Sequence, residues 1–347
     1  MVVPESKTPH TFEQYHTASG AVIYRLPLEG LPRFWVYAYL VRVDGMTVLI
    51  DTGTGWVNAN QGLEDGLAQA GVQWGDLTHV LLTHGHIDHF GGLGYVRARA
   101  QAQVGIHELD VRNITHYEER IFVVDRRLER YLLEAGVPDE RRAEMMRLYR
   151  LNKSMFTSQA VDFTYEAHGM RFGPFEFLHV PGHTAGHVII RLHDVLFSGD
   201  HVLDGISPHQ SPERLTLNTG LGHYLDSLNV LEAWGGQARL TFGGHNDPIA
   251  DLPGRIRTLR QRHHERLAAI LSAFEAPLTI CEVADMLFPR VRGYDILLAI
   301  EETGAHVEYL YQRGLLRLAN LPELESNPDA PLRYQRIEDA VVKLQLA

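Results

Sequence analysis

The residues of this sequence that are most able to do chemistry are histidines and an aspartate gathered in one short segment. Residues 83–89 read Thr-His-Gly-His-Ile-Asp-His, so four groups that can bind a metal ion lie within six consecutive positions. Imidazole nitrogens and carboxylate oxygens are good ligands for zinc and for several neighbouring first-row metals. Single histidines are often only capped or solvated, but four ligand-type side chains this close together favour a metal site.

Three later segments repeat this arrangement of an apolar run followed by a glycine-containing turn that carries His or Asp. The turns hold His183, Asp200 and His245. Each apolar run reads as a buried strand, and so does the run at 80–82 before the first motif. Four strand ends of this kind describe one site that is assembled at the edge of a sheet.

Taken together, these motifs resemble the metallo-β-lactamase superfamily over residues from about 22 to 249. The resemblance depends on H-x-H-x-D-H at 84–89, P-G-H-T-x-G-H at 181–187 and D-T-G at 51–53. It implies an α+β fold, an αββα sandwich, that holds two metal ions. By this resemblance the first metal would bind His84, His86 and His183, the second would bind Asp88, His89 and His245, and Asp200 would bridge the two.

The implied centre has a clear chemistry. A bridging carboxylate offers two oxygens and a negative charge, which reduces the repulsion between two dications about 3.5–4 Å apart. A water shared by the metals would have its pKa lowered toward neutrality and would attack an acyl carbon or phosphorus as hydroxide. Asp88 would orient that hydroxide and accept its proton. We expect two zinc ions per chain, although iron or manganese would suit the same ligands.

Composition sets the outer limits of the prediction. The chain has 347 residues, 45% of them hydrophobic, which is enough for one large domain and a smaller one. A formal net charge of −11 argues against attraction of the whole surface to nucleic acid or to an anionic membrane. The single cysteine, Cys281, fits a reducing compartment. No segment resembles a signal peptide or a bilayer-spanning run, so we expect a cytoplasmic protein with no membrane partner.

The segments before the first motif read as strands in a meander. Apolar runs cover residues 22–26, 34–43 and 46–50. Asp44-Gly45 supplies a two-residue hairpin turn between the last two runs. Asp51, which closes the third run, has two readings. It either accepts a hydrogen bond from a ligand imidazole or caps the turn before a helix at 57–70.

A helical insertion from about 108 to 157 separates the first ligand cluster from His183. Apolar residues with three-four spacing lie on one stripe of a helix, and the segment 136–138 breaks it before a second helix. This hairpin would be a lid or a wall beside the metal cleft. Its methionine and aromatic residues either line a substrate pocket or pack into the core or a homodimer seam, and their helical spacing favours packing. His107 and His116, in the same segment, read as ordinary polar residues.

A glycine- and proline-containing loop follows Asp200 and carries His209. Residues on such a loop would overhang the metals. His209 is therefore a candidate proton donor to the leaving group, or a substrate contact. The alternative is a solvated loop histidine.

We expect a metallo-β-lactamase-like domain over residues 1–250 and a second, small domain over 251–347. Residues 279–282 predict a capping box that starts one of its helices. Helices followed by a two-stranded hairpin at 315–319 and 333–337 resemble the winged-helix tail of the endoribonuclease-like branch of the superfamily. The helix that opens this domain carries five arginines: Arg255, Arg257, Arg260, Arg262 and Arg266. They would contact nucleic-acid phosphates or a substrate carboxylate, or else solvate the helix and pair with acidic residues.

Three activities remain open on the sequence alone. The ligand set resembles that of glyoxalase II and favours a hydrolase of esters, thioesters or lactones with a small acyl substrate, although the insertion and the tail argue against glutathione. The tail suggests a phosphodiesterase or endoribonuclease acting on single-stranded RNA, for which the arginines would have to face the cleft. A third reading is an oxidoreductase with one iron, like persulfide dioxygenase-like relatives.

Overall fold

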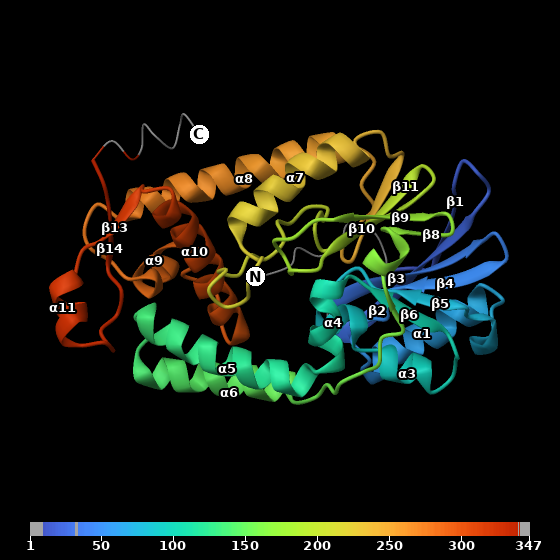
Figure 1. Ribbon diagram of the computed structural model, residues 1–347, viewed down its shortest axis with the longest axis horizontal. Coiled ribbons are helices and arrows are strands. Elements are labelled where there is room, and N and C mark those ends of the chain that lie inside the picture. The colour runs from blue at the N-terminus through green and yellow to red at the C-terminus, as the bar shows by residue number, and fades with distance from the viewer. Residues whose placement is uncertain (1–9, 32–33, 339, 341–347) are drawn as a thin grey trace.

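Two β-sheets packed face to face carry the ligand motifs (Figure 1). The computed structural model describes residues 10–31, 34–338 and 340. The seven-stranded sheet is formed, in order, by β1 (Glu13–His16), β2 (Val22–Leu31), β3 (Phe34–Val43), β4 (Met46–Ile50), β5 (His79–Leu81), β6 (Gln103–Ile106) and β7 (Phe163–Thr164). The five-stranded sheet runs β12 (Leu240–Gly243), β11 (Val195–Gly199), β10 (Val188–Leu192), β9 (Phe175–His179) and β8 (Arg171–Phe172).

The meander predicted from the sequence is confirmed. Strands β1 to β4 pair antiparallel, while β4 to β7 pair parallel. Asp44 and Gly45 both have positive φ, 48° and 77°, as a tight two-residue hairpin turn requires. The change from antiparallel to parallel pairing occurs at β5, the strand that leads into the first histidine motif.

Side chains from both sheets form the core between them. Tyr39 and Ile50 of the seven-stranded sheet and Phe197 and Phe242 of the five-stranded sheet are among its fully or almost fully buried members. The outer face of each sheet is covered by helices. The result is the predicted αββα sandwich, in which the two sheets hold each other and each is closed by a helical layer.

The helices of the described chain are these: α1 (Val57–Gln69), α2 (Ile87–Phe90), α3 (Leu93–Arg97), α4 (Glu108–Thr115), α5 (Tyr117–Glu134), α6 (Asp139–Lys153), α7 (Leu221–Gly235), α8 (Leu252–Ala273), α9 (Ile280–Leu287), α10 (Tyr294–Gln312) and α11 (Leu321–Ser326). Short 3-10 turns lie at Trp74–Asp76 and Glu166–His168, and strands β13 (Leu316–Leu318) and β14 (Tyr334–Arg336) pair with each other. Helix α3 ends at Arg97, with Ala98 as its C-cap. No helix within the described ranges is both long and apolar enough to cross a bilayer.

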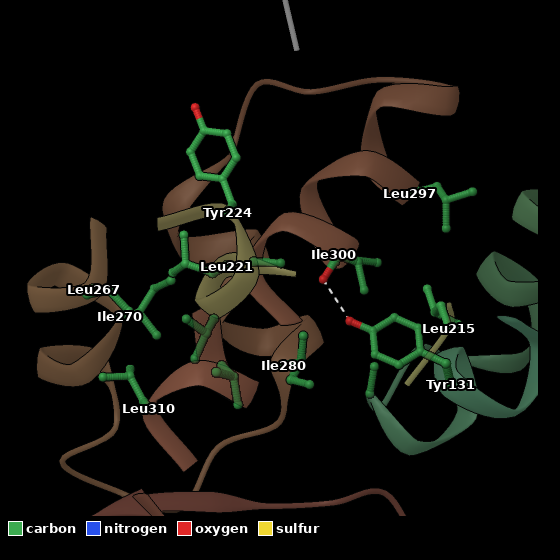
Figure 2. Packing of buried hydrophobic residues seen from close by; sticks show 14 of the residues in the cluster. Tyr131, Leu215, Leu221, Tyr224, Leu267, Ile270, Ile280, Leu297, Ile300 and Leu310 are labelled. Atoms are coloured by element: carbon green, nitrogen blue, oxygen red, sulfur yellow. Dashed lines mark hydrogen bonds between the residues drawn. The ribbon is translucent and has the colours of Figure 1, made fainter. Parts of the chain in front are cut away.

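The helical insertion is anchored at its far end. Helices α5 and α6 run together from the sandwich to the C-terminal helices (Figure 1). There the Tyr131 hydroxyl donates to the carbonyl of Ile300 at 2.9 Å (Figure 2), and the Cys281 amide donates to the carbonyl of Ala135 at 2.9 Å. The far end of the insertion is therefore fixed to the C-terminal helices.

The methionine and aromatic residues of the insertion mostly pack inward. Met145, Met146 and Tyr149 are buried in one apolar cluster with residues of α7, α8 and α10. This agrees with the core-packing reading of their helical spacing. Met155, at 52% exposure, is an exception.

The C-terminal segment contains the predicted helices and hairpin. The Thr279 hydroxyl accepts from the Glu282 amide at 3.2 Å and the Glu282 carboxylate accepts from the Thr279 amide at 2.7 Å, which confirms the predicted capping box. The likeness to a winged helix and the domain boundary at residue 250 stay predictions. Helix α8 begins at the boundary, and its buried face shares the apolar cluster with α7.

Candidate metal centre

All seven predicted ligand side chains meet at one end of the sandwich, in two groups. The first group contains His84, His86 and His183, and the second contains Asp88, His89, Asp200 and His245. Within each group the potential ligand atoms lie within 4.8 Å of one another. The sequence predicted the edge of one sheet, but the strands involved come from both sheets, because β5 belongs to the seven-stranded sheet and β9, β11 and β12 to the other.

Asp200 belongs to the second group but also approaches a histidine of the first. Its Oδ1 is 3.3 Å from His89 Nε2, and its Oδ2 is 3.6 Å from His183 Nε2. The same Oδ2 is 3.4 Å from His245 Nε2. This is the place that a bridging carboxylate would occupy.

Four of these side chains carry a buried polar atom that finds no hydrogen-bond partner in the described part of the chain. The atoms are Nε2 of His84, His89 and His183, and Oδ1 of Asp200. Leaving a buried polar atom unpaired costs about 1–3 kcal/mol. Since all four belong to the two groups just described, bound cations would satisfy them together. The residues present therefore fit metal ions.

The charges of the centre favour cations as well. Burial lowers the pKa of His84 and His86 well below the ordinary value, so both rings are neutral, as metal ligands must be. Burial alone would raise the pKa of Asp200, but the nearby His245 and His89 outweigh it and keep the carboxyl group ionised. Although burial opposes protonation, Asp200 raises the pKa of both His89 and His245, so these two rings would release their protons when a cation binds. Imidazoles and carboxylates together provide the donor set that zinc and its neighbours prefer.

Asp51 stands directly behind a candidate ligand. Its Oδ2 accepts a hydrogen bond from His89 Nδ1 at 2.8 Å, and its Oδ1 accepts from the Thr83 amide at 2.8 Å. The first bond fixes the tautomer of His89 and leaves Nε2 free for the centre. The capping alternative is wrong, because α1 is preceded by Trp56 and carries no side-chain cap.

Backbone carbonyls orient two more of the histidines. His183 Nδ1 donates to the carbonyl of His209 at 3.0 Å, and His245 Nδ1 donates to the carbonyl of Trp35 at 2.7 Å. Both rings therefore present Nε2 toward the centre.

Sequence reasoning missed Asp110 of α4, which ties two ligand loops together. This fully buried carboxylate accepts from the Gly85 amide at 2.8 Å and from the Gly186 amide at 3.0 Å. It also accepts from the Thr184 hydroxyl at 2.7 Å. A lone aspartate in a predicted helix gives no local signal of this role, because its partners lie 25 to 76 positions away along the chain.

His187 lies in the quoted motif but received no role from the sequence. Its buried ring stacks on His84 with centroids 4.7 Å apart, and its Nε2 accepts from the Asp200 amide at 3.1 Å. His187 thus supports one ligand and the backbone of another.

The side chain of His209 contacts two carboxylates of α10. Its Nε2 lies 3.0 Å from a Glu301 oxygen and its Nδ1 lies 3.5 Å from a Glu302 oxygen. Although burial opposes its protonation, these carboxylates raise the pKa of His209 to about 9. The solvated reading is therefore wrong, and the contact that His209 makes with a candidate ligand runs through its carbonyl. Proton donation to a leaving group stays a prediction.

The arginines of α8 mostly contact the protein itself. Arg255 Nε donates to the carbonyl of Leu203 at 2.6 Å, and Arg262 Nη1 donates to the carbonyl of Gly205 at 2.8 Å. Arg260 pairs with Glu232 at 2.6 Å, and Arg266 pairs with Glu302. Four of the five arginines are thus engaged on their own chain.

Known proteins share both sequence and fold with this chain. Residues 32–252 match the family model described as the Metallo-beta-lactamase superfamily. The chain is 26% identical over 286 residues to the probable metallo-hydrolase YqjP of Bacillus subtilis, covering 79% of this chain and 87% of the relative. It is 27% identical over 239 residues to an atrochrysone carboxyl ACP thioesterase of Claviceps purpurea, covering 68% of this chain but only 58% of that protein.

Solved structures agree over nearly the whole length. The metallo-beta-lactamase family protein TTHA1429 of Thermus thermophilus superposes with a TM-score of 0.73 and 30% identity, covering 91% of this chain and 98% of that one. A beta-lactamase domain protein of Burkholderia ambifaria gives a TM-score of 0.73 at 20% identity, covering 96% and 97%, and so supports the fold alone. At these coverages the structural likeness extends well beyond the residues 32–252 that match the family model.

Proposed function

The chain belongs to the metallo-beta-lactamase superfamily and is a metal-dependent hydrolase, and we propose that it cleaves an ester, thioester or lactone at a centre of two zinc ions. The observation that carries the number of metals is the position of Asp200, whose two oxygens face histidines of both groups. A single metal would leave one group of three or four convergent ligands without a function.

The residues of the centre would have separate roles in metal binding and proton transfer. When bound, the two ions supply Lewis acidity toward a substrate oxygen and lower the pKa of water. His84, His86 and His183 would hold one ion, while Asp88, His89 and His245 would hold the other. Asp88, with 20% of its side chain exposed against 10% for Asp200, is the more accessible of these two carboxylates and would accept a proton from the attacking water. Asp51 keeps His89 in the tautomer that the centre needs.

An acyl substrate is favoured over RNA by the arginine contacts. Charge-assisted bonds to phosphates need free guanidinium groups facing the cleft. In this chain Arg255, Arg260 and Arg266 donate to carbonyls or carboxylates of their own protein. The similarity to a fungal protein named a thioesterase supports the acyl class further. Seven convergent ligands favour two metals over the mononuclear iron alternative.

Metal analysis of the purified protein tests the proposal first. We expect close to two zinc ions per chain, and hydrolysis of members of a panel of thioesters, esters and lactones with no cleavage of single-stranded RNA. Replacing Asp200 by Ala should remove metal from one or both groups, while Asp226→Ala, at an exposed position of α7, should leave the metal content unchanged. One iron and no zinc, or cleavage of RNA alone, would overturn the proposal.

A further inference from the structure

The loop that leaves Asp200, residues 203–211, is held from behind by the C-terminal helices. From α8, Arg255 and Arg262 donate to the carbonyls of Leu203 and Gly205. From α10, Glu301 Oε2 lies 3.0 Å from His209 Nε2 and accepts from the Ser211 hydroxyl at 3.3 Å. The path of this loop is therefore set by residues that follow it by roughly 50 positions or more.

One peptide group in this loop connects the C-terminal helices to the metal centre. The carbonyl of His209 accepts from His183 Nδ1 at 3.0 Å. The amide of Gln210, in the same peptide group, donates to Glu302 Oε2 at 2.8 Å. Because a peptide group is planar and rigid, rotating it to lose one bond would also move the other. Glu302 and His183 thus hydrogen-bond to opposite sides of the same peptide group.

Glu302 is built to hold this orientation. Its side chain is 5% exposed, and its other oxygen, Oε1, pairs with Arg266. Burial raises the pKa of Glu302, but Arg266 and His209 outweigh burial and keep the carboxyl group ionised. A charged acceptor makes the bond from the Gln210 amide stronger than a neutral acceptor would.

The histidines around Glu302 hydrogen-bond within this cluster, and the Glu302 oxygens are occupied by other donors. His263, Glu302 and His306 lie within ligand distance of one another, and all three are buried. However, both Glu302 oxygens already accept from other donors, and His306 Nδ1 donates to the backbone carbonyl of Glu302 at 2.7 Å. His263 Nδ1 lies 3.1 Å from His306 Nε2 and completes the chain of bonds.

We propose that Glu302 is a positioning residue for the metal ligand His183, acting through the peptide group between His209 and Gln210. This proposal rests on the proposed function in one respect, namely that His183 binds metal. Through this contact helix α10 would support the metal centre. Outer partners of metal ligands typically change metal affinity or activity about 10–100-fold when they are removed.

The test measures zinc affinity by competition with a chromogenic chelator, on the full chain. Glu302→Ala should weaken zinc binding about 10–100-fold. The matched control is Glu308→Gln, because Glu308 also lies on α10 and accepts a loop amide, that of Glu213, at 2.7 Å, but its loop contact lies away from His183. The control should keep the affinity of the unchanged chain.

A double-mutant cycle separates positioning from general support of the fold. If Glu302 acts through His183, Glu302→Ala should cause no further loss of zinc affinity in a chain that already carries His183→Ala. An equal loss in both backgrounds, or unchanged affinity in a folded Glu302→Ala chain, would overturn the proposal. Should Glu302→Ala fail to fold, the isosteric Glu302→Gln enters the same cycle, with a smaller loss expected and the same outcomes decisive.

Failure of the proposed substrate class can be distinguished from failure of the proposed role of Glu302. A chain that binds two metals but hydrolyses none of the acyl compounds would remove the proposed substrate class. The affinity cycle would still decide the role of Glu302, because it reads metal binding and not turnover.

Discussion

Gly244, next to the candidate ligand His245, shows how closely the centre is packed at the scale of single residues. A Cβ atom at this position would lie 2.4 Å from Asp200 Oδ1 and 2.5 Å from His89 Cε1. Real Cβ atoms essentially never come so near to other heavy atoms, so one or both of these ligands would have to move. Glycine is therefore required here by the metal centre itself.

We predict that Gly244→Ala displaces Asp200 or His89 and lowers kcat/KM about 100-fold, since a shift of about 1 Å in a catalytic group has effects of that size. Metal content and kcat/KM of the purified variant measure this. Gly75→Ala is the control, because a Cβ there meets no heavy atom within 4 Å. Full activity and two bound metals in Gly244→Ala would contradict the packing argument.

What the sequence could predict at this scale follows from how local each signal is. His84, His86, Asp88 and His89 stand within one short segment, and the other three ligands each follow a strand in a recognisable turn. Asp110 and Glu302 gave no such signal, because their partners are backbone amides and a hydroxyl on distant loops. Any polar residue in a helix would look the same until the loops were placed.

At the scale of elements, α4 connects the insertion to the ligand loops through Asp110. Removing this carboxylate would leave the amides of Gly85 and Gly186 and the hydroxyl of Thr184 without their acceptor. Each buried donor left unpaired costs about 1–3 kcal/mol. These loops also carry the ligands His84, His86 and His183.

We therefore predict that Asp110→Ala lowers the free energy of unfolding by about 3 kcal/mol or more and also weakens metal binding. Urea denaturation and chelator competition would measure the two effects. Asp139→Ala, at a 90% exposed carboxylate that pairs with Arg142, should cost less than about 1 kcal/mol and leave metal binding unchanged. Equal effects of the two substitutions would show that Asp110 has no special role.

The ends of helices and strands were predicted well where a few neighbouring residues determine them. The hairpin turn at Asp44-Gly45 and the capping box at Thr279 are examples, because each is decided by two to four neighbouring residues. The sequence did not decide whether the insertion is a lid or a wall. That choice depends on contacts such as the bond from Tyr131 to Ile300, which joins residues 169 positions apart.

At the scale of the whole molecule, one apolar cluster joins the insertion, the outer face of the five-stranded sheet and the C-terminal helices. Ionisable groups are buried at the joint between α8 and α10. His263 and His306 are both fully buried where α8 meets α10. Burial, with mutual repulsion, lowers the pKa of His263 to about 3, and burial, partly offset by Glu302, lowers the pKa of His306 to about 4.

These two histidines predict a loss of stability in mild acid. In the unfolded chain an imidazole has a pKa of about 6.5, so below that pH the unfolded state binds more protons than the folded state. Their contribution to stability is complete above about pH 6.5 and is lost progressively as the pH falls toward about 3–4. For His263 alone, the loss between pH 7 and pH 5 amounts to about 2 kcal/mol.

We predict that His263→Gln flattens the pH dependence of the free energy of unfolding by about 2 kcal/mol between pH 7 and pH 5, whatever its effect at pH 7. Urea denaturation at several pH values measures this slope. The control is His264→Gln, at the next position of α8, whose side chain is exposed. Protonation of the metal-binding histidines contributes equally to all three proteins, so it cancels in the comparison. If His263→Gln and the unchanged chain lose stability in parallel, the joint between α8 and α10 does not depend on a neutral His263.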